Sequence, residues 1–179
     1  NSANNALTII PDLSEDPRAD TADIITAWET QKFSLARIGG HSEGTNTLAL
    51  KAGTHAEGNY TIANGNYSHA EGQNTITTGE SAHAEGWKTT ASNYHAHAEG
   101  SSTTASGQQS HAEGRSSIAS GNVSHAEGSN TIAVSGNQHV QGKNNISDAD
   151  EEGNALNTYA HIVGNGLSPM KRSNAHTLD

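Results

Sequence analysis

A tetrapeptide, His-Ala-Glu-Gly, returns every 14 residues through the middle of this chain. Six copies are identical, a variant His-Ser-Glu-Gly precedes them and a diverged His-Val-Gln-Gly follows them. All eight keep one register, with first residues His41, His55, His69, His83, His97, His111, His125 and His139. A period this short and strict predicts an all-β solenoid with one 14-residue coil of backbone per repeat. It also favours a structural or adhesive function, because an enzyme needs one unique constellation of side chains.

The composition limits how such a coil can be filled. Leu, Ile, Val and Phe together make up 24 of the 179 residues, and the formal net charge is -10. These values are typical of disorder, but a disordered segment has no reason to keep a fixed phase. We therefore expect a thin coil filled by Ala, Gly, Thr and Ser. Such a coil buries little apolar surface alone, which predicts an oligomer in which each coil buries a second face.

Several classes of function are disfavoured by what the chain lacks. The 9 Lys and Arg residues are scattered, which disfavours a nucleic-acid partner. No apolar run is long enough for membrane insertion, and no cysteine is present for disulfides. The first residues lack an initiator Met and the features of a signal peptide, so we expect a fragment or a processed product. No cofactor and no catalytic residue is predicted, since no Gly-x-Ser-x-Gly elbow marks a nucleophile.

Each coil is expected to hold two short strands, and each strand is followed by a glycine. We number the coil from its His, so the tetrapeptide glycine is position 4 and a second recurrent glycine is position 11. The glycine at position 4 predicts a backbone conformation that rejects a Cβ, such as a left-handed turn. Asn93 replaces the glycine at position 11 once, and Asn tolerates the left-handed region. A left-handed residue is therefore expected at position 11 as well, at Gly65, Gly79, Gly107 and Gly121.

Strand alternation predicts which side chains face inward. In the first strand, His and Glu should lie on the face opposite to Ala. In the second, Thr at position 7 and Ala at position 9 should fill the interior. Position 8 should then face outward, at Leu48, Ile62, Ile76, Thr90, Thr104, Ile118, Ile132 and Ile146. Coils stack about 4.8 Å apart, so like residues form ladders.

The His and Glu ladders are the main candidate site. A column of Glu repels itself, and an adjacent column of His relieves this by hydrogen bonding or by carrying charge. We predict a mixed ladder at a seam between chains, facing either a threefold axis or solvent. Histidines converging on such an axis could hold Zn²⁺, but a metal-free hydrogen-bonded ladder is the favoured hypothesis. Its members are His55, Glu57, His69, Glu71, His83, Glu85, His97, Glu99, His111, Glu113, His125 and Glu127.

The repeat unit Ser-His-Ala-Glu-Gly-x-x-Thr-x-Ala-Ser-Gly-x-x resembles the head repeat of trimeric autotransporter adhesins, Ser-Val-Ala-Ile-Gly-x-x-Ala-x-Ala-x-Gly-x-x. The resemblance implies a left-handed parallel β-roll that packs as a parallel homotrimer. The His-and-Glu version is more similar to repeats in phage and prophage tail or appendage proteins of Gram-positive hosts. In that family, segments like Tyr159–Gly166 and Ser173–Asp179 follow the repeats and often lead into a self-cleaving chaperone domain.

This resemblance covers about residues 41–179 and implies a receptor-binding shaft or head of a phage tail fibre or appendage. The implied location is the virion or the extracellular bacterial surface. The implied partners are two further copies of the chain, other tail proteins, and a host-surface glycan or protein. A bacterial cell-surface adhesin head is the alternative, and a glycan depolymerase is a third hypothesis.

Three segments are expected along the chain. Residues 1–40 should be an N-terminal cap or connector, with a strand at 7–10 and with Trp28 and Phe33 covering the open end of the solenoid. Residues 41–152 should form the repeat solenoid. Residues 153–179 should be a C-terminal transition segment, with a strand at 159–163.

Two further groups of side chains are candidate sites. Tyr60, Tyr67, Trp87 and Tyr94 are expected to be exposed on one flank, either as a sugar-stacking or protein-contact patch or as plain loop decoration. An acidic cluster could hold Ca²⁺, but its spacing departs from the EF-hand pattern, so a solvated loop is predicted. The cluster comprises Asp148, Asp150, Glu151 and Glu152.

Overall fold

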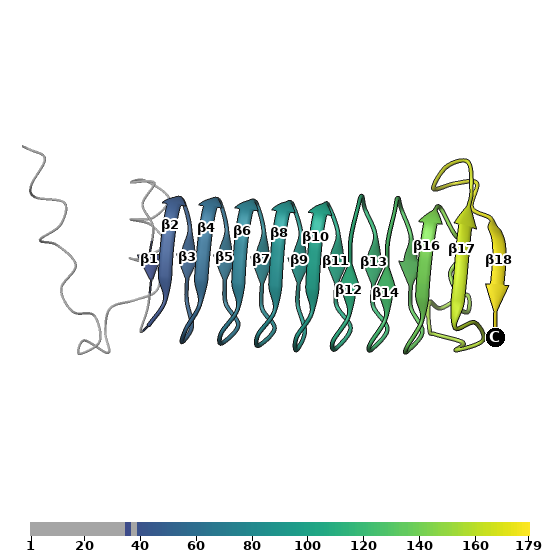
Figure 1. The fold of residues 1–179 in the computed structure, drawn as a ribbon, viewed down its shortest axis with the longest axis horizontal. Helices are drawn as coiled ribbons and strands as arrows, with labels where there is room; N and C mark the ends of the chain where they lie inside the picture. The colour runs from purple at the N-terminus through teal and green to yellow at the C-terminus, as the bar shows by residue number, and fades with distance from the viewer. Residues whose placement is uncertain (1–34, 37–38) are drawn as a thin grey trace, which may run out of the picture. The chain divides into compact units, whose positions relative to one another are not determined.

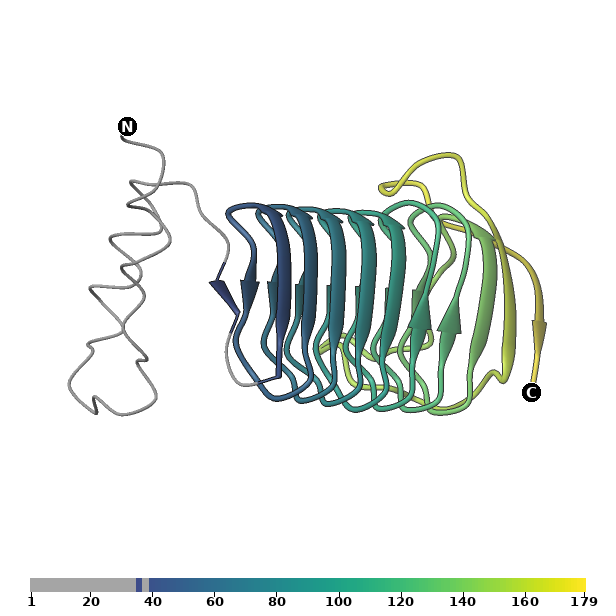
Figure 2. The same cartoon turned by 60° about the vertical axis from the view of Figure 1, so that its left-hand side comes forward.

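The chain folds as a parallel β-solenoid, as the repeat predicts (Figure 1). The computed structural model describes residues 35–36 and 39–179, which belong to one compact unit. Each 14-residue coil from His41 to Gln138 contributes one strand to each of two sheets, and Figure 2 shows the coils stacked along one axis. The strand expected at 7–10 and the cap at Trp28 and Phe33 lie outside the described residues. Within those residues, no helix is long and apolar enough to span a membrane.

The two sheets differ in the part of the repeat that they use. We call the ten-stranded sheet the His sheet and the eight-stranded sheet the Ile sheet. The strands of the His sheet are β2 (His41–Thr45), β4 (His55–Asn59), β6 (His69–Gln73), β8 (His83–Trp87), β10 (His97–Ser101), β12 (His111–Ala112), β14 (His125–Ala126), β16 (His139–Lys143), β17 (His161–Asn165) and β18 (Asn174–Leu178). Those of the Ile sheet are β1 (Leu35–Ala36), β3 (Leu48–Ala49), β5 (Ile62–Ala63), β7 (Ile76–Thr77), β9 (Thr90–Ala91), β11 (Thr104–Ala105), β13 (Ile118–Ala119) and β15 (Ile132–Ala133).

The strand register places each residue beside its counterpart in the next coil. In the His sheet, His69 pairs with His83 and Glu71 pairs with Glu85, with both strands parallel. In the Ile sheet, Ile118 pairs with Ile132. The coil length predicted from the sequence period is therefore confirmed, and like side chains form continuous columns.

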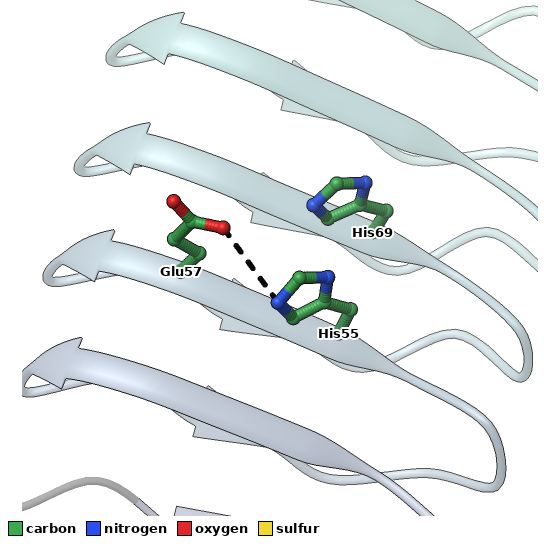
Figure 3. A group of neighbouring side chains, drawn as sticks. All are labelled: His55, Glu57 and His69. Carbon is green, nitrogen blue, oxygen red and sulfur yellow. Dashed lines mark ion pairs between the residues drawn. The ribbon is translucent and has the colours of Figure 1, made fainter.

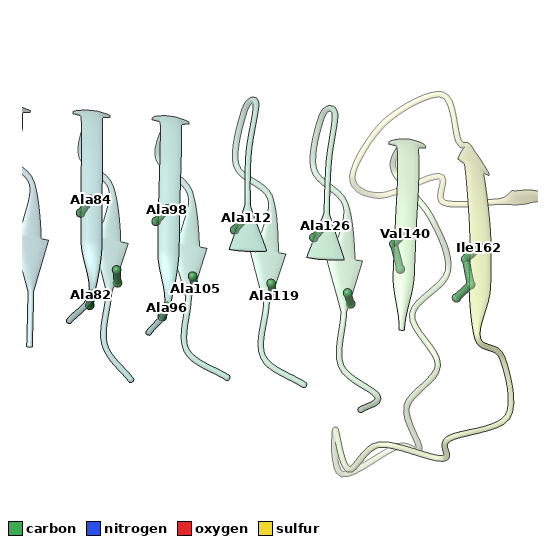
Figure 4. Packing of buried hydrophobic residues seen from close by; sticks show 12 residues of the cluster. Ala82, Ala84, Ala96, Ala98, Ala105, Ala112, Ala119, Ala126, Val140 and Ile162 are labelled. Atoms are coloured by element: carbon green, nitrogen blue, oxygen red, sulfur yellow. The ribbon is translucent and has the colours of Figure 1, made fainter. Parts of the chain in front are cut away.

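The interior is built almost entirely from single methyl groups and threonine side chains. Thr at position 7 is fully buried in six coils, and Ile76 and Ile118 at position 8 are 36% and 38% exposed. The predicted inward and outward faces are therefore confirmed. The alanines with no exposed surface are Ala49, Ala56, Ala63, Ala70, Ala84, Ala91, Ala98, Ala105, Ala112, Ala119, Ala126 and Ala133. Larger groups enter at the C-terminal end, where Val140 and Ile162 continue the alanine column (Figure 4).

The turns confirm one glycine prediction and correct the other. Gly58, at position 4, has a φ of 110°, and an added Cβ would collide with the carbonyl of Gly72. Gly65, at position 11, is not left-handed, and neither is Asn93 in the same column. The left-handed residue of that turn is two positions later, at Tyr67 in this coil. At Gly65 an added Cβ would strike the backbone of the next coil, although Asn93 and Ser135 occupy the same position in other coils.

The C-terminal segment returns to the solenoid instead of leaving it. β17 begins 22 residues after β16 and pairs with it in parallel, His139 with His161 and Gly142 with Gly164. This strand lies two residues later than the predicted 159–163. β18 then runs antiparallel to β17 and covers the edge of the His sheet, which otherwise would present unpaired backbone groups.

A side chain terminates the Ile sheet. The amide of Asn145 accepts a hydrogen bond from the N–H of Ile132 at 2.8 Å and donates one to its carbonyl at 3.0 Å. One coil earlier, the N–H of Ile118 is bound by the backbone carbonyl of Thr131. Asn145 thus supplies through its side chain what the backbone of a further strand would supply, and it is fully buried there.

Candidate functional site: the histidine–glutamate ladder

The histidines at position 1 form a stacked column along the His sheet. From His41 to His139, consecutive ring centroids are 4.5–4.9 Å apart and the rings lie within 11° of parallel. His161 extends the column with a tilt of 32°. The in-register parallel pairing causes this stacking, because it gives every His the same backbone environment one coil apart.

The glutamates at position 3 flank the histidine column. In one half of the ladder each carboxylate is nearest the His of its own coil, as for Glu57 and His55, 3.7 Å apart (Figure 3). In the other half it is nearest the His of the next coil, as for Glu99 and His111, 3.8 Å apart. The carboxylates of Glu57, Glu71, Glu99 and Glu113 each have a ligand atom within 4.8 Å of two imidazole nitrogens. The other pairs are His41–Glu43, His69–Glu71, His83–Glu85, His125–Glu113 and His139–Glu127, at 3.3–4.0 Å.

Few of these contacts are hydrogen bonds, which differs from the predicted hydrogen-bonded ladder. His139 Nε2 makes one with Glu127 Oε1 at 3.3 Å. The Nε2 atoms of six histidines have almost no solvent-accessible surface and no hydrogen-bond partner among the residues that the structure describes: His55, His69, His83, His97, His111 and His125. A buried polar atom without a partner destabilises a fold by roughly 1–3 kcal/mol. The ladder face therefore carries a regular row of unsatisfied nitrogen atoms.

The packing of the ladder favours neutral imidazoles. Burial lowers the pKa of His69, the neighbouring His83 and His55 lower it further, and Glu71 and Glu57 partly oppose this. The pKa of His97 is lowered in the same way by burial and by His111 and His83. At neutral pH these two rings are uncharged and carry a lone pair, while the carboxylates beside them keep the face negative.

Four sets of three side chains on this face have the residue types of a metal site. In each set, one ligand atom from two histidines and from the glutamate between them all lie within 4.8 Å of one another. The sets are His55–Glu57–His69, His69–Glu71–His83, His97–Glu99–His111 and His111–Glu113–His125. Imidazole and carboxylate are ligands that Zn²⁺ accepts.

The four aromatic residues are exposed as expected, but they do not share one flank. Tyr60, at position 6, lies in the turn that leads from the His sheet to the Ile sheet, and Trp87, at position 5, is the last residue of β8 before the same turn of its coil. Tyr67 and Tyr94 lie at positions 13 and 12, in the turns that lead back. The strand order therefore separates the proposed patch into two pairs at opposite edges of the coil.

The edge that carries Tyr94 also has a shallow groove of about 340 Å³. Its walls come from positions 10–12 of successive coils, mostly amides and hydroxyls: Asn64, Asn66, Thr78, Ser92 and Asn93. Glu80 is the one carboxylate among its lining residues, and Lys51 lies at one end. The sequence did not single out this groove, although the polar residues that recur at positions 10–12 are visible in it.

The acidic segment after the repeats is only partly a solvated loop. Asp150 and its acidic neighbours Glu151 and Glu152 are not buried, but Asp148 is 3% exposed. Its Oδ2 accepts hydrogen bonds from the hydroxyl of Ser135 at 2.8 Å and from the N–H groups of Thr158 and Tyr159 at 2.8 and 3.1 Å.

Burial raises the pKa of Asp148, but these hydrogen bonds outweigh it and hold the pKa below its ordinary value. Asp148 thus ties the segment after residue 144 to the last coil. The prediction of a solvated loop is wrong for this residue, since its side chain is buried and its Oδ2 atom already accepts hydrogen bonds from the chain.

Fold and ladder together define a class: a parallel β-solenoid of 14-residue coils with columns of histidine and glutamate on one sheet. No protein-family model matches the chain, and comparisons with characterised proteins and with solved structures found no match either.

Proposed function

We propose that this chain is the rigid, receptor-binding part of a phage tail fibre or appendage, and that it assembles as a parallel homotrimer. The observation that carries the proposal is the row of six buried, unpartnered imidazole nitrogens on the His sheet. The ladder repeats the same hydrogen-bonding groups at a constant spacing along its length. A second copy of the chain in parallel orientation presents groups at that same spacing. The side chains of His55 and His69 are about one-third exposed, so a turn of the rings toward a second copy packed on this face would give these nitrogen atoms partners.

The thin core supports the same proposal. The solenoid interior holds little beyond methyl groups and threonine side chains over most of its length, so one chain gains little from apolar burial. Association through the His sheet buries a second face for every coil. Three parallel chains then present three equal copies of every surface turn, which turns weak contacts into avidity.

Host attachment is assigned in this proposal to the groove beside Tyr94. Amides and hydroxyls with an aromatic ring at the margin are groups that hydrogen-bond to and stack on sugars. Hydrolysis of a glycosidic bond usually takes two carboxylates, and the groove has one, Glu80. This favours binding of a host-surface glycan over its cleavage.

The mass in solution tests the assembly. Light scattering should give three times the chain mass of 18.5 kDa. His83→Lys places an extra positive charge on the His sheet and should reduce the mass to that of one chain. Thr90→Lys places it on the Ile sheet and should leave the trimer intact. A folded monomer of the unmodified chain would refute the proposal, and loss of the trimer in the Thr90 variant alone would assign the seam to the other sheet.

The attachment surface is tested with a panel of host cell-wall glycans. Tyr94→Ala should weaken binding, and Tyr60→Ala, at the opposite edge, should not.

The alternative, a bacterial adhesin head, is distinguished by the neighbouring genes: baseplate and lysis genes favour a phage, and a membrane anchor favours an adhesin. Release of shortened glycan by the protein would instead support a depolymerase.

A further inference from the structure

The ladder geometry fits a metal ion better than it fits the hydrogen bonds expected from the sequence. His69 Nε2 and Glu71 Oε2 are 3.5 Å apart, and His83 Nε2 and Glu85 Oε2 are 4.0 Å apart. Neither nitrogen atom has a hydrogen-bond partner. Two ligands of one tetrahedral zinc ion, each with a bond of about 2.0–2.1 Å, stand about 3.4 Å apart. An ion between the two groups would use both without requiring them to approach each other.

The third ligand comes from the neighbouring coil. In the set shown in Figure 3, Glu57 faces both His55 and His69, and all three ligand atoms lie within 4.8 Å of one another. Closing the set on one ion requires the two stacked imidazoles to turn toward each other. The ladder itself accommodates such a turn at its C-terminal end, where His139 and His161 are tilted by 32°. The rings of His55 and His69 are about one-third exposed, which leaves them room to rotate.

The donor types select the ion. Two imidazole nitrogens with one carboxylate suit zinc and other late first-row divalent ions, whereas calcium and magnesium prefer sites built from oxygen alone. We propose that the His sheet binds Zn²⁺ through these His–Glu–His sets, with two ions on each chain.

The stoichiometry follows from the overlap between sets. His69 belongs to the first two sets and His111 to the last two. One Nε2 atom can bind a single ion, so each overlapping pair of sets can hold one ion at a time. The number of bound ions per chain is thus two, one on each side of the gap between His83 and His97.

The same overlap gives a sharp experiment on the full chain. Isothermal titration with Zn²⁺, and with Co²⁺ followed by its visible absorption, should give two ions per chain in the unmodified protein. His69→Gln should leave one ion, His111→Gln should leave one, and the double variant should bind none. His41→Gln with His95→Gln is the matched control and should still bind two, because neither residue belongs to a set. Circular dichroism of each variant checks that the fold is kept.

Three results would overturn the proposal. The first is no binding at millimolar Zn²⁺ by the folded, unmodified chain. The second is two bound ions in the folded double variant. The third is one ion for every three chains, which would indicate histidines that converge on a threefold axis. If the double variant does not fold, the two single variants decide the matter, since each must lose one ion and keep the other.

Discussion

Glycines in this solenoid avoid two separate costs, left-handed backbone strain and collision with the next coil. Alanine substitutions at chosen glycines measure the two costs separately. Gly100 has a φ of 99°, and an added Cβ would also collide with the carbonyl of Gly114 in the next coil. Gly107, in the same coil, is not left-handed, but its added Cβ would collide with the carbonyl of Gly121. The first position therefore combines backbone strain with a collision, and the second has the collision alone.

Two glycines near the C-terminal end complete the comparison. Gly153 has a φ of 88° and no atom within 4 Å of an added Cβ, so it tests backbone strain alone. Gly136 has no left-handed φ, and its added Cβ would meet only the carbonyl of Asn122, in ordinary contact at 3.6 Å. Gly136→Ala is the control for the loss of conformational freedom in the unfolded chain, which stabilises an alanine variant by about 0.4–1 kcal/mol.

The expected costs are measured relative to that control. Left-handed backbone at an L-residue costs roughly 1–2 kcal/mol, which is the expected effect of Gly153→Ala. Forcing one extra carbon into packed surroundings costs roughly 1–3 kcal/mol, the expected effect of Gly107→Ala. Gly100→Ala should show both effects, about 2–5 kcal/mol.

Urea denaturation followed by circular dichroism, at one fixed protein concentration, measures the four variants. The fixed concentration matters because the stability of an oligomer depends on it. A Gly100→Ala midpoint equal to that of Gly136→Ala would refute the reasoning, since it would mean that the coils can separate without cost. Equal midpoints for Gly100→Ala and Gly107→Ala would show that collision alone explains the glycine column.

Three other predictions concern charge and strain. The pKa of His69 and of His97 lies below the ordinary 6.5, so the unfolded chain binds more protons. Stability should be complete above about pH 6.5 and decline as the pH falls toward the folded-state pKa values; equal melting temperatures at pH 8 and pH 5 would contradict this. Asp148→Ala should reduce the free energy of unfolding by about 2–3 kcal/mol because charged hydrogen bonds are lost, whereas Asp150→Ala should have little effect; chemical denaturation measures both. Val123 has a φ of 58°, so Val123→Asn should raise the stability by about 1 kcal/mol, and an unchanged thermal midpoint would show that the strain is relieved elsewhere.

The repeat predicts a large part of the fold because a solenoid depends on local periods. A residue that recurs every 14 positions must occupy the same place in every coil, and alternation along a strand then decides its face. The burial of Ala56 and Thr61 and the outward position of Ile76 followed from these two periods alone. The turns were harder to predict. At Gly65 and Gly107 the backbone of a neighbouring coil leaves no room for a Cβ, and the left-handed residue lies at position 13, where Tyr67 and Val123 give no sequence signal.

Residue spacing along the chain was enough to predict the coil length, the two sheets, the inward alanines and the His and Glu columns. The remaining features depend on contacts between residues distant in sequence. The length of each His–Glu contact depends on how the coils stack. In this stacking the Nε2 of His83 has no hydrogen-bond partner, whereas that of His139 is hydrogen-bonded to Glu127. The return of His161 to the ladder after a longer loop, and the burial of Asp148, depend on pairing with strands and loops distant in sequence. Contacts of this kind do not recur from coil to coil, so the sequence repeat does not predict them.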